Sequence, residues 1–379
     1  MIPLFKVFMH ESAAENVKNT LTSGFITQGP KVEEFEEQLK NTFSYPYILT
    51  LNSGTSGLTL ALRLIKDKYN LNDNTEVLTS PLTCMATNEP ILANNMKIKW
   101  VDTDLNTCNM DLGDLKKKIT HDTKVIMIVH WGGTPINLNK LEHILDHTEE
   151  KFGFRPQVIE DCAHSFMAEY ENKMIGTFGY YSVFSLQAIK HLTTGDGGLI
   201  FLPNKEEYER AKLLRWYGID RDRRNFNRKD LRLEHDVVDW GYKYHMNDIN
   251  ATIGLSNLPH IKELIEKNRK NAALYDTLFE KEPSVKIMKP NKNSKSAYWL
   301  YTIRVPNKEE LILFLKENNI MSSQVHKRND IHSCFNKFRA TLSNLEQMES
   351  ELLCIPVGWW VSESEILNIS NKIKEFLHQ

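Results

Sequence analysis

The chain has 379 residues, of which 41% are hydrophobic and 25% are charged, and its formal net charge is −2. This length allows two domains with large cores, and the composition is that of an ordinary soluble globular protein. The charge balance excludes an overall electrostatic attraction to nucleic acid, and no apolar run approaches the length that spans a bilayer.

Apolar segments that are typical of strands alternate with helical patterns in the N-terminal part of the chain. Strands are predicted at residues 47–51, 76–80, 97–101, 124–130, 157–160, 180–185 and 198–202, and helices at 56–67, 85–94, 111–118 and 137–151. This alternation predicts an α/β domain with a mostly parallel sheet that is covered by helices on both faces.

The pattern changes after about residue 245. The sequence predicts a long helix over 248–282, a strand at 298–305, a helix at 307–318 and further elements near 320–325 and 363–377. These elements favour a smaller α+β domain. We therefore expect a large domain over residues 1–245, whose N-terminal segment could pack on the small domain, and a small domain over 246–379.

A lysine in a glycine-rich segment is the first chemical signal. Lys190 stands three residues before Thr193-Thr194-Gly195-Asp196-Gly197-Gly198, and an apolar strand follows. A lysine in such a turn beside buried strands can be desolvated, which lowers its pKa and makes its amine a nucleophile toward carbonyls. Taken alone, the segment is weak evidence, because most lysines near glycine turns are solvated.

Two further motifs follow predicted strands. Asn52-Ser53-Gly54-Thr55-Ser56-Gly57 opens a helix, where free N–H groups, the helix dipole and hydroxyls could bind a phosphate. An ordinary N-cap explains the same residues, and the ending of a Walker loop is missing. In Glu160-Asp161-Cys162-Ala163-His164, a carboxylate at a strand end could keep a pyridinium nitrogen protonated or could simply cap the next element.

With Thr27-Gln28-Gly29-Pro30 and Gly241-Tyr242-Lys243-Tyr244, these motifs resemble, in order and spacing, the DegT/DnrJ/EryC1/StrS family of sugar aminotransferases. The resemblance runs from about residue 3 into the C-terminal region. It implies the α/β fold of PLP fold type I, which is aspartate-aminotransferase-like. It also implies a homodimer with shared active sites, in which residues 241–247 reach into the partner subunit.

The resemblance also implies roles in binding pyridoxal 5′-phosphate (PLP). Lys190 would form the Schiff base and move the substrate proton, Asp161 would pair with the pyridine nitrogen, and His164 would contact the phenolic oxygen. The remaining cofactor-binding positions are Gly54, Thr55, Ser56 and Ser185. Lys243 could meet a phosphate of the cofactor or of the substrate as a point charge.

Three positions depart from the family pattern. Cys84 stands where an aromatic residue usually stacks on the cofactor ring, so the stacking is lost or another group, such as Trp131, supplies it. Lys243 replaces an asparagine, and Asp196 replaces the commoner glutamate.

No metal site is expected. The five cysteines are odd in number and scattered, which predicts free thiols and, without a signal-peptide pattern, a cytoplasmic protein.

Some relatives carry histidine in place of the lysine and are sugar 3-dehydratases, but the Thr-Thr-Gly register places Lys190, and not His191, at that position. The predicted function is therefore transfer of an amino group from glutamate to a nucleotide-linked keto-sugar, with a 4-keto-6-deoxy sugar ahead of a 3-keto sugar. The alternatives are a PLP-dependent nucleotide-sugar dehydratase, a non-sugar aminotransferase and a catalytically idle regulatory relative.

Other polar residues are candidates for substrate contact. His326 and Arg328 could meet phosphate or sugar hydroxyls, and His130 at a strand end is either near the cofactor or a satisfied core histidine. The run from Lys116 to Lys118 is interpreted as a solvated face. A denser arginine cluster could border a sugar diphosphate; it comprises Arg221, Arg223, Arg224, Arg228 and Arg232.

Overall fold

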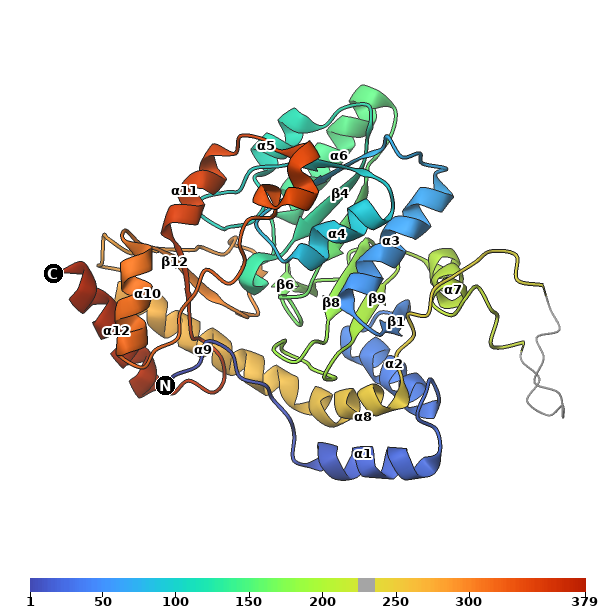
Figure 1. The fold of residues 1–379 in the computed structure, drawn as a ribbon, viewed down its shortest axis with the longest axis horizontal. Coiled ribbons are helices and arrows are strands. Elements are labelled where there is room, and N and C mark those ends of the chain that lie inside the picture. Colours follow the sequence, from blue (N-terminus) through green and yellow to red (C-terminus); the bar gives the residue numbers. More distant parts are fainter. Residues whose placement is uncertain (224–235) are drawn as a thin grey trace.

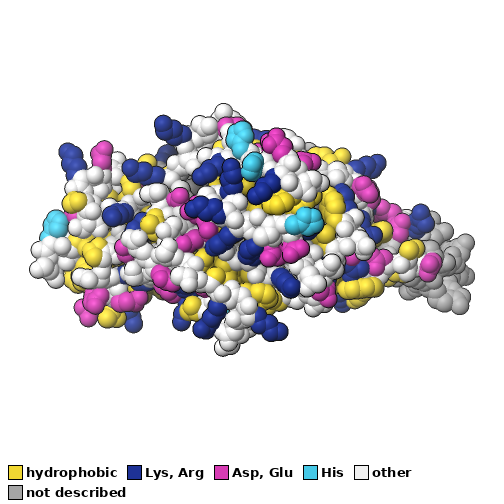
Figure 2. All heavy atoms as spheres, turned by 90° about the horizontal axis from the view of Figure 1, so that it is seen from above, with side chains coloured by type: hydrophobic (Ala, Val, Ile, Leu, Met, Phe, Trp, Pro, Cys, Tyr) yellow, Lys and Arg dark blue, Asp and Glu magenta, His cyan; other side chains and the backbone are white. Residues whose placement is uncertain are grey.

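The computed structural model describes residues 1–223 and 236–379, so that three arginines of the cluster, Arg224, Arg228 and Arg232, lie outside the described residues. A central sheet with helices on both faces forms the larger part, and a smaller unit lies beside it (Figure 1). On the face shown in Figure 2, basic side chains are interspersed with acidic ones, in keeping with the small net charge. Among the described helices, none has both the length and the apolar character needed to cross a membrane.

The central sheet has seven strands in the order β1-β9-β8-β5-β4-β2-β3. They are β1 (Ile48–Leu51), β2 (Glu76–Thr79), β3 (Lys97–Trp100), β4 (Thr123–Val129), β5 (Gln157–Asp161), β8 (Tyr181–Ser185) and β9 (Gly198–Phe201). Neighbouring strands are parallel from β3 to β8, whereas β9 is antiparallel to both of its neighbours. The predicted fold class and all seven predicted strands are confirmed, each to within one residue at its ends.

Helices cover both faces of this sheet. They are α2 (Pro30–Phe43), α3 (Gly54–Lys68), α4 (Met85–Ala93), α5 (Leu112–Lys118), α6 (Leu138–Phe152) and α7 (Lys205–Leu214), whereas α1 (Ser12–Ser23) packs on α8 (Asp248–Asn257). Successive residues of a strand point to opposite faces. In β4, Val125 and Met127 therefore pack into the core formed with α3 and α7, and Ile126 and Ile128 pack into the core formed with α2 and α6.

Two helices, α8 (Asp248–Asn257) and α9 (Ile261–Phe279), lead from the central sheet to the small domain (Figure 1). The prediction of one continuous helix over 248–282 is wrong, because a short 3-10 turn at Leu258–His260 separates the two. Pro259 lies in this turn and has no N–H to donate to the preceding helical turn.

The small domain is built around the antiparallel sheet β10-β12-β13. Its elements are β10 (Lys286–Ile287), β12 (Tyr301–Arg304), α10 (Lys308–Glu317), α11 (Ser343–Glu351), β13 (Leu352–Ile355) and α12 (Glu363–Leu377). A third, short sheet comprises β6 (Glu169–Tyr170), β7 (Lys173–Met174) and β11 (Ser294–Lys295). The predicted element at 320–325 contains only single bridges, from Ile320 to Ile2 and from Ser323 to Cys354.

The sheet brings the predicted functional segments to one edge. Because β5 and β8 are parallel, Asp161 and Ser185 end their strands side by side. Strand β1 is antiparallel to β9, which is itself antiparallel to β8, so β1 also ends at this edge and continues through Ser53 into α3. The carboxyl edge of a parallel sheet is where open α/β proteins bind their ligands.

Candidate active site

Lys190 lies in the loop after β8 and is half-buried. Its Nζ atom is 3.6 Å from the centroid of the Trp299 ring. Burial lowers the pKa of Lys190 to about 8, and the nearby Asp161 carboxylate and Cys84 thiol oppose part of this shift. A substantial fraction of the amine is therefore neutral, and so nucleophilic, near physiological pH.

His191 has a different environment from its neighbour. Its Nε2–H donates to the carbonyl oxygen of Ala297 over 3.0 Å. Burial lowers the pKa of His191 to about 4. The two adjacent side chains are thus separated, with His191 attached to the segment that leads into the small domain and Lys190 directed toward Asp161 and Trp299.

Asp161 is buried at the end of β5, and both of its carboxylate oxygens accept hydrogen bonds. The backbone N–H of Ala163 donates to Oδ1 over 3.0 Å, and the Thr87 hydroxyl donates to Oδ2 over 2.7 Å. Thr87 in turn bonds to the Thr83 hydroxyl at 2.7 Å. A carboxylate held in this way keeps a fixed plane, which suits pairing with a protonated ring nitrogen.

His164 is buried, and its Nδ1 atom has no hydrogen-bond partner among the described residues. Its ring stacks on Trp299 with centroids 3.8 Å apart and lies parallel to His326 at 5.6 Å. Burial, with a further contribution from the charge of Lys190, lowers the pKa of His164 well below its usual value. A buried nitrogen without a partner fits the phenolic oxygen of PLP.

Of the two predicted substrate contacts in the C-terminal segment, the structure brings only His326 to this place. Burial, together with the charge of Lys190, lowers the pKa of His326 to about 4, and the ring lies against His164 and Trp131. Arg328 instead forms a bidentate ion pair with Asp330, at 2.8 and 2.6 Å, and approaches Glu349. Its charge is balanced within the small domain.

The segment after β1 forms the N-terminus of α3. Ser53 caps the helix, because its side chain accepts from the backbone N–H of Ser56 at 3.1 Å. Thr55 is exposed at this end, and Ser185 lies so close to Gly54 that a Cβ atom there would be 3.3 Å from the serine Cβ. The capping bond uses one N–H and leaves the others of the first turn free for an anion, so that the Ser53 cap is compatible with an anion cradle at this helix N-terminus.

Lys243 is exposed, and only its backbone joins this cradle. Its carbonyl accepts from the Asn52 side chain at 3.3 Å, and the Tyr244 carbonyl accepts from the Asn52 N–H at 2.7 Å. Nearby, the guanidinium of Arg221 donates to the Gln28 carbonyl and lies 4.6 Å from the Trp216 ring.

His130 is a buried histidine whose ring nitrogens both have partners. Its Nδ1 accepts from the Ile136 N–H at 3.2 Å, and its Nε2–H donates to Glu160 at 3.2 Å. The other Glu160 oxygen accepts from the Ser182 hydroxyl. Cys162 lies close enough to complete a metal-sized group, yet these hydrogen bonds already satisfy the polar atoms of the pair. The structure supports the interpretation of His130 as a core histidine.

Cys84 is exposed at the start of α4, near Lys190. The ring of Trp131 lies edge-on to His164 and His326, with ring centroids 6.2 and 5.9 Å away. Trp131 is buried, and its indole N–H donates to the Thr302 hydroxyl at 3.1 Å. Thr87 and Trp299 are the site residues that the sequence motifs did not indicate. Neither belongs to a recognisable motif, and both reach the site through contacts distant in sequence.

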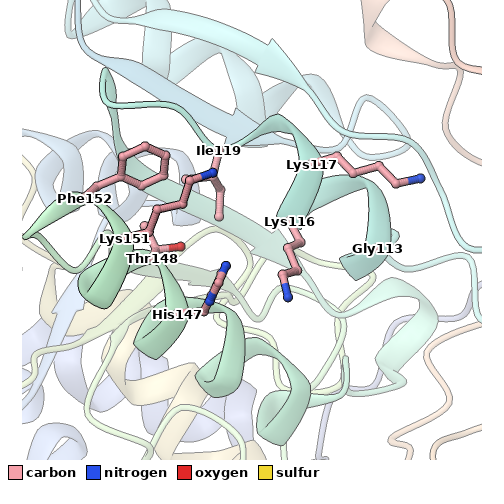
Figure 3. A pocket seen from close by; sticks show the side chains of 8 residues that line it. All are labelled: Gly113, Lys116, Lys117, Ile119, His147, Thr148, Lys151 and Phe152. Atoms are coloured by element: carbon pink, nitrogen blue, oxygen red, sulfur yellow. The ribbon is translucent and has the colours of Figure 1, made fainter.

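The lysines of the 116–118 run lie elsewhere. Lys116 and Lys117 are exposed and line a pocket of about 290 Å³ between α5 and α6, together with His147 and Lys151 (Figure 3). Lys116, Lys117 and Lys151 stand in the last turns of their helices, where cations complement the helix dipole. This pocket is a solvated basic surface, as predicted for the run.

The residues at the sheet edge fit PLP: a lysine with a lowered pKa, a fixed carboxylate, a buried nitrogen without a partner, and a helix N-terminus beside a serine. The model of the DegT/DnrJ/EryC1/StrS aminotransferase family matches residues 8–374.

Among solved structures, the sugar aminotransferase CalS13 from Micromonospora echinospora is 39% identical, with a TM-score of 0.94 over 99% of this chain and 100% of that one. AtS13 from Actinomadura melliaura is 42% identical, with a TM-score of 0.94 over 99% and 98% of the two chains. The UDP-4-amino-4-deoxy-L-arabinose–oxoglutarate aminotransferase of Shewanella sediminis is 27% identical over 99% of this chain and 98% of its own. The chain therefore belongs to the DegT/DnrJ/EryC1/StrS family and is a PLP-dependent sugar aminotransferase.

Proposed function

We propose that this enzyme transfers an amino group from glutamate to carbon 4 of a nucleotide-linked 4-keto-6-deoxy sugar. The observation that carries the proposal is the Lys190 amine, whose pKa is lowered to about 8 by burial and which faces Asp161 at the carboxyl edge of the sheet. The Shewanella relative supports carbon 4, a nucleotide-linked sugar and an oxoglutarate-coupled reaction, because its name specifies all three.

PLP, when bound, supplies the electron sink that stabilises negative charge at the substrate carbon. In this proposal Lys190 would hold the cofactor through its amine and, when that amine is free, would move a proton at the substrate carbon. Asp161 holds the ring nitrogen in its protonated form. Gly54, Thr55, Ser56 and Ser185 hold the phosphate at the N-terminus of α3.

Neutral histidines complete the proposed site. Burial keeps the pKa values of His164 and His326 low, so that both rings are uncharged at neutral pH. Each neutral ring can donate a hydrogen bond to the cofactor oxygen or to a sugar hydroxyl through its N–H, and can accept one from a sugar hydroxyl through its other nitrogen. Neither ring then competes with Lys190 as a base. Lys190 is then the group that transfers the proton, which is the task a lysine with a pKa close to the working pH performs well.

The proposal includes a homodimer. The segment before residues 241–247 exposes Val238 (91%) and Trp240 (63%), and the α1–α2 loop exposes Phe25 (61%) and Ile26 (51%). Apolar side chains of this size are costly to leave in water and are typical of a surface that a partner covers. Light scattering of the purified protein tests the dimer, and a single-chain mass would contradict it.

The cytoplasm is the proposed compartment, because all five cysteines are free thiols.

The central experiment is to record the visible absorbance of the purified protein with PLP and then to add glutamate. We expect the band of the lysine-bound cofactor to fall as the band of pyridoxamine phosphate rises, with one 2-oxoglutarate released per site. Glutamate that leaves the spectrum unchanged would contradict the proposed donor.

The sugar is tested next by offering the aminated enzyme nucleotide-linked 4-keto-6-deoxy and 3-keto-6-deoxy sugars. The 4-keto sugar should restore the original spectrum and yield an amino sugar. Restoration by the 3-keto sugar alone would move the reaction to carbon 3, and a deoxygenated product without nitrogen would identify a dehydratase. In Lys190→Ala, kcat should fall at least about 10²-fold. A Lys190→Ala variant with full activity would contradict the catalytic role of Lys190.

A further inference from the structure

Trp299 is fixed to the backbone beside Lys190. Its indole N–H donates to the carbonyl oxygen of Ile189, the residue before the lysine, over 2.8 Å. The Lys190 Nζ atom is 3.6 Å from the centroid of the ring. The hydrogen bond therefore sets the position of the ring relative to the lysine more tightly than packing alone would.

Two further rings pack on the same indole. Phe5 stacks on Trp299 with centroids 4.8 Å apart and planes inclined by 26°, and His164 stacks on it at 3.8 Å and 19°. Trp299 itself is only 5% exposed. Since stacking contacts and one hydrogen bond restrain it, the indole offers Lys190 a rigid, electron-rich surface.

We propose that Trp299 is a positioning residue that holds the amine of Lys190 whenever this amine is not bonded to the cofactor. The inference rests on the proposed function, in which the Lys190 amine, when it is free, must stay near the substrate carbon. A lysine side chain has several rotatable bonds and loses conformational entropy when it is ordered. An aromatic face attracts an ammonium ion and so defines one resting position.

The surrounding charges agree with this role. The titratable groups that face the amine are Asp161 at the end of β5, Cys84 at the start of α4, and the rings of His164 and His326. Both histidines are neutral near pH 7, so neither competes for the electron-rich ring. Lys190 is the only cation among these groups.

The direct test measures the pKa of Lys190 in the cofactor-free protein by competitive acetylation with acetic anhydride and peptide mass spectrometry. In Trp299→Leu, which keeps an apolar side chain and loses the π face, we expect this pKa to fall by about half a unit to one unit. Trp299→Phe keeps a face and should lie between Trp299→Leu and the wild type. An unchanged or raised pKa in Trp299→Leu would overturn the proposal.

Phe5→Leu is the matched control, because Phe5 packs on Trp299 and removing its ring loosens the same stack. We expect the pKa of Lys190 in this variant to equal that of the wild type. An equal shift in Phe5→Leu and Trp299→Leu would show that loosened packing, and not the indole face, sets the pKa, and would overturn the proposal.

The holoenzyme gives a second readout. In Trp299→Leu, we expect kcat to fall about tenfold while the KM for glutamate changes less than about twofold, because the lysine is misplaced and binding is not. The isotope effect with α-deuterated glutamate should increase, since proton transfer becomes limiting. Unchanged kcat and isotope effect would contradict the role of Trp299, whereas an active Lys190→Ala variant would contradict the proposed function itself.

Discussion

The Thr87 hydroxyl donates a 2.7 Å hydrogen bond to Oδ2 of Asp161, across 74 positions of sequence. A carboxylate only accepts, so the single proton of Thr87 points to Asp161, and its oxygen accepts from Thr83 at 2.7 Å. The direction of this hydroxyl relay is thereby fixed. It places an ordered donor behind the carboxylate that we propose as the partner of the ring nitrogen.

Replacing Thr87 by valine should lower kcat/KM about tenfold and the free energy of unfolding by about 1–3 kcal/mol, because it keeps the shape but takes a donor from the buried Asp161 carboxylate. Thr87→Ser should restore most of the activity. The pH at which the absorbance of the lysine-bound cofactor changes should also shift in Thr87→Val, since the ring nitrogen then faces a less constrained carboxylate. Identical spectra and kinetics in the valine variant would show that Thr87 has only a packing role.

Uptake of PLP by the cofactor-free protein should accelerate as the pH rises through about 8. The neutral amine is the attacking species, and burial lowers the pKa of Lys190 from 10.5 to about 8. Below this value the rate should fall about tenfold per pH unit, and above it the rate should level off. Stopped-flow absorbance measures the profile, and a midpoint near 10.5 would show that the lysine is solvated.

Gly198→Ala should weaken PLP binding about tenfold, because overpacking of this kind costs on the order of 1–3 kcal/mol. A Cβ atom at Gly198 would collide with the backbone of Ser53 and Gly54, which form the proposed phosphate cradle. Gly113→Ala is the matched control, since a Cβ there meets only the Asp111 carboxylate, at 3.1 Å. Fluorescence titration with PLP compares the two, and equal affinities would contradict the position of the cradle.

His130→Phe should lower the free energy of unfolding by about 3 kcal/mol, because the fully buried Glu160 loses a donor. His147→Ala on the exposed side of α6 should change it by less than about 0.5 kcal/mol. Chemical denaturation of the cofactor-free proteins gives both values. A His130→Phe variant as stable as the wild type would show that the hydrogen bond between His130 and Glu160 contributes nothing to stability.

The sequence predicted the inner strands of the central sheet well because they are buried on both faces, so that β4, for example, contains the hydrophobic run from Val125 to Val129. The edge strand β3 instead alternates lysine with buried apolar residues, which is also a strand pattern. Helices α1 and α2 were not predicted. Both carry many polar residues and owe their place to contacts with distant elements, such as the packing of α1 on α8. The break at Pro259 was missed because the apolar periodicity continues on both sides of it.

Motifs placed Lys190, Asp161, His164 and the start of α3 at one sheet edge, since each follows a strand of known direction. They could not place Trp299, Thr87 or the ion pair of Arg328, because these depend on how the small domain and α4 pack against the sheet. Arg328 illustrates the difficulty. Its partner Asp330 is two residues away, yet only the folded segment shows that the pair is buried and closed.

The position of Phe5 has a consequence for biosynthesis. The first residues of the chain find their partners near its end: Ile2 pairs with Ile320, and the Pro3 carbonyl accepts from the indole of Trp360. The ring that supports Trp299 therefore has no fixed place until almost the whole polypeptide has left the ribosome. This part of the active site is therefore completed only after the segment that carries Trp360 has been synthesised, and an extension added before Met1 would start at the small domain, beside the bridge between Ile2 and Ile320.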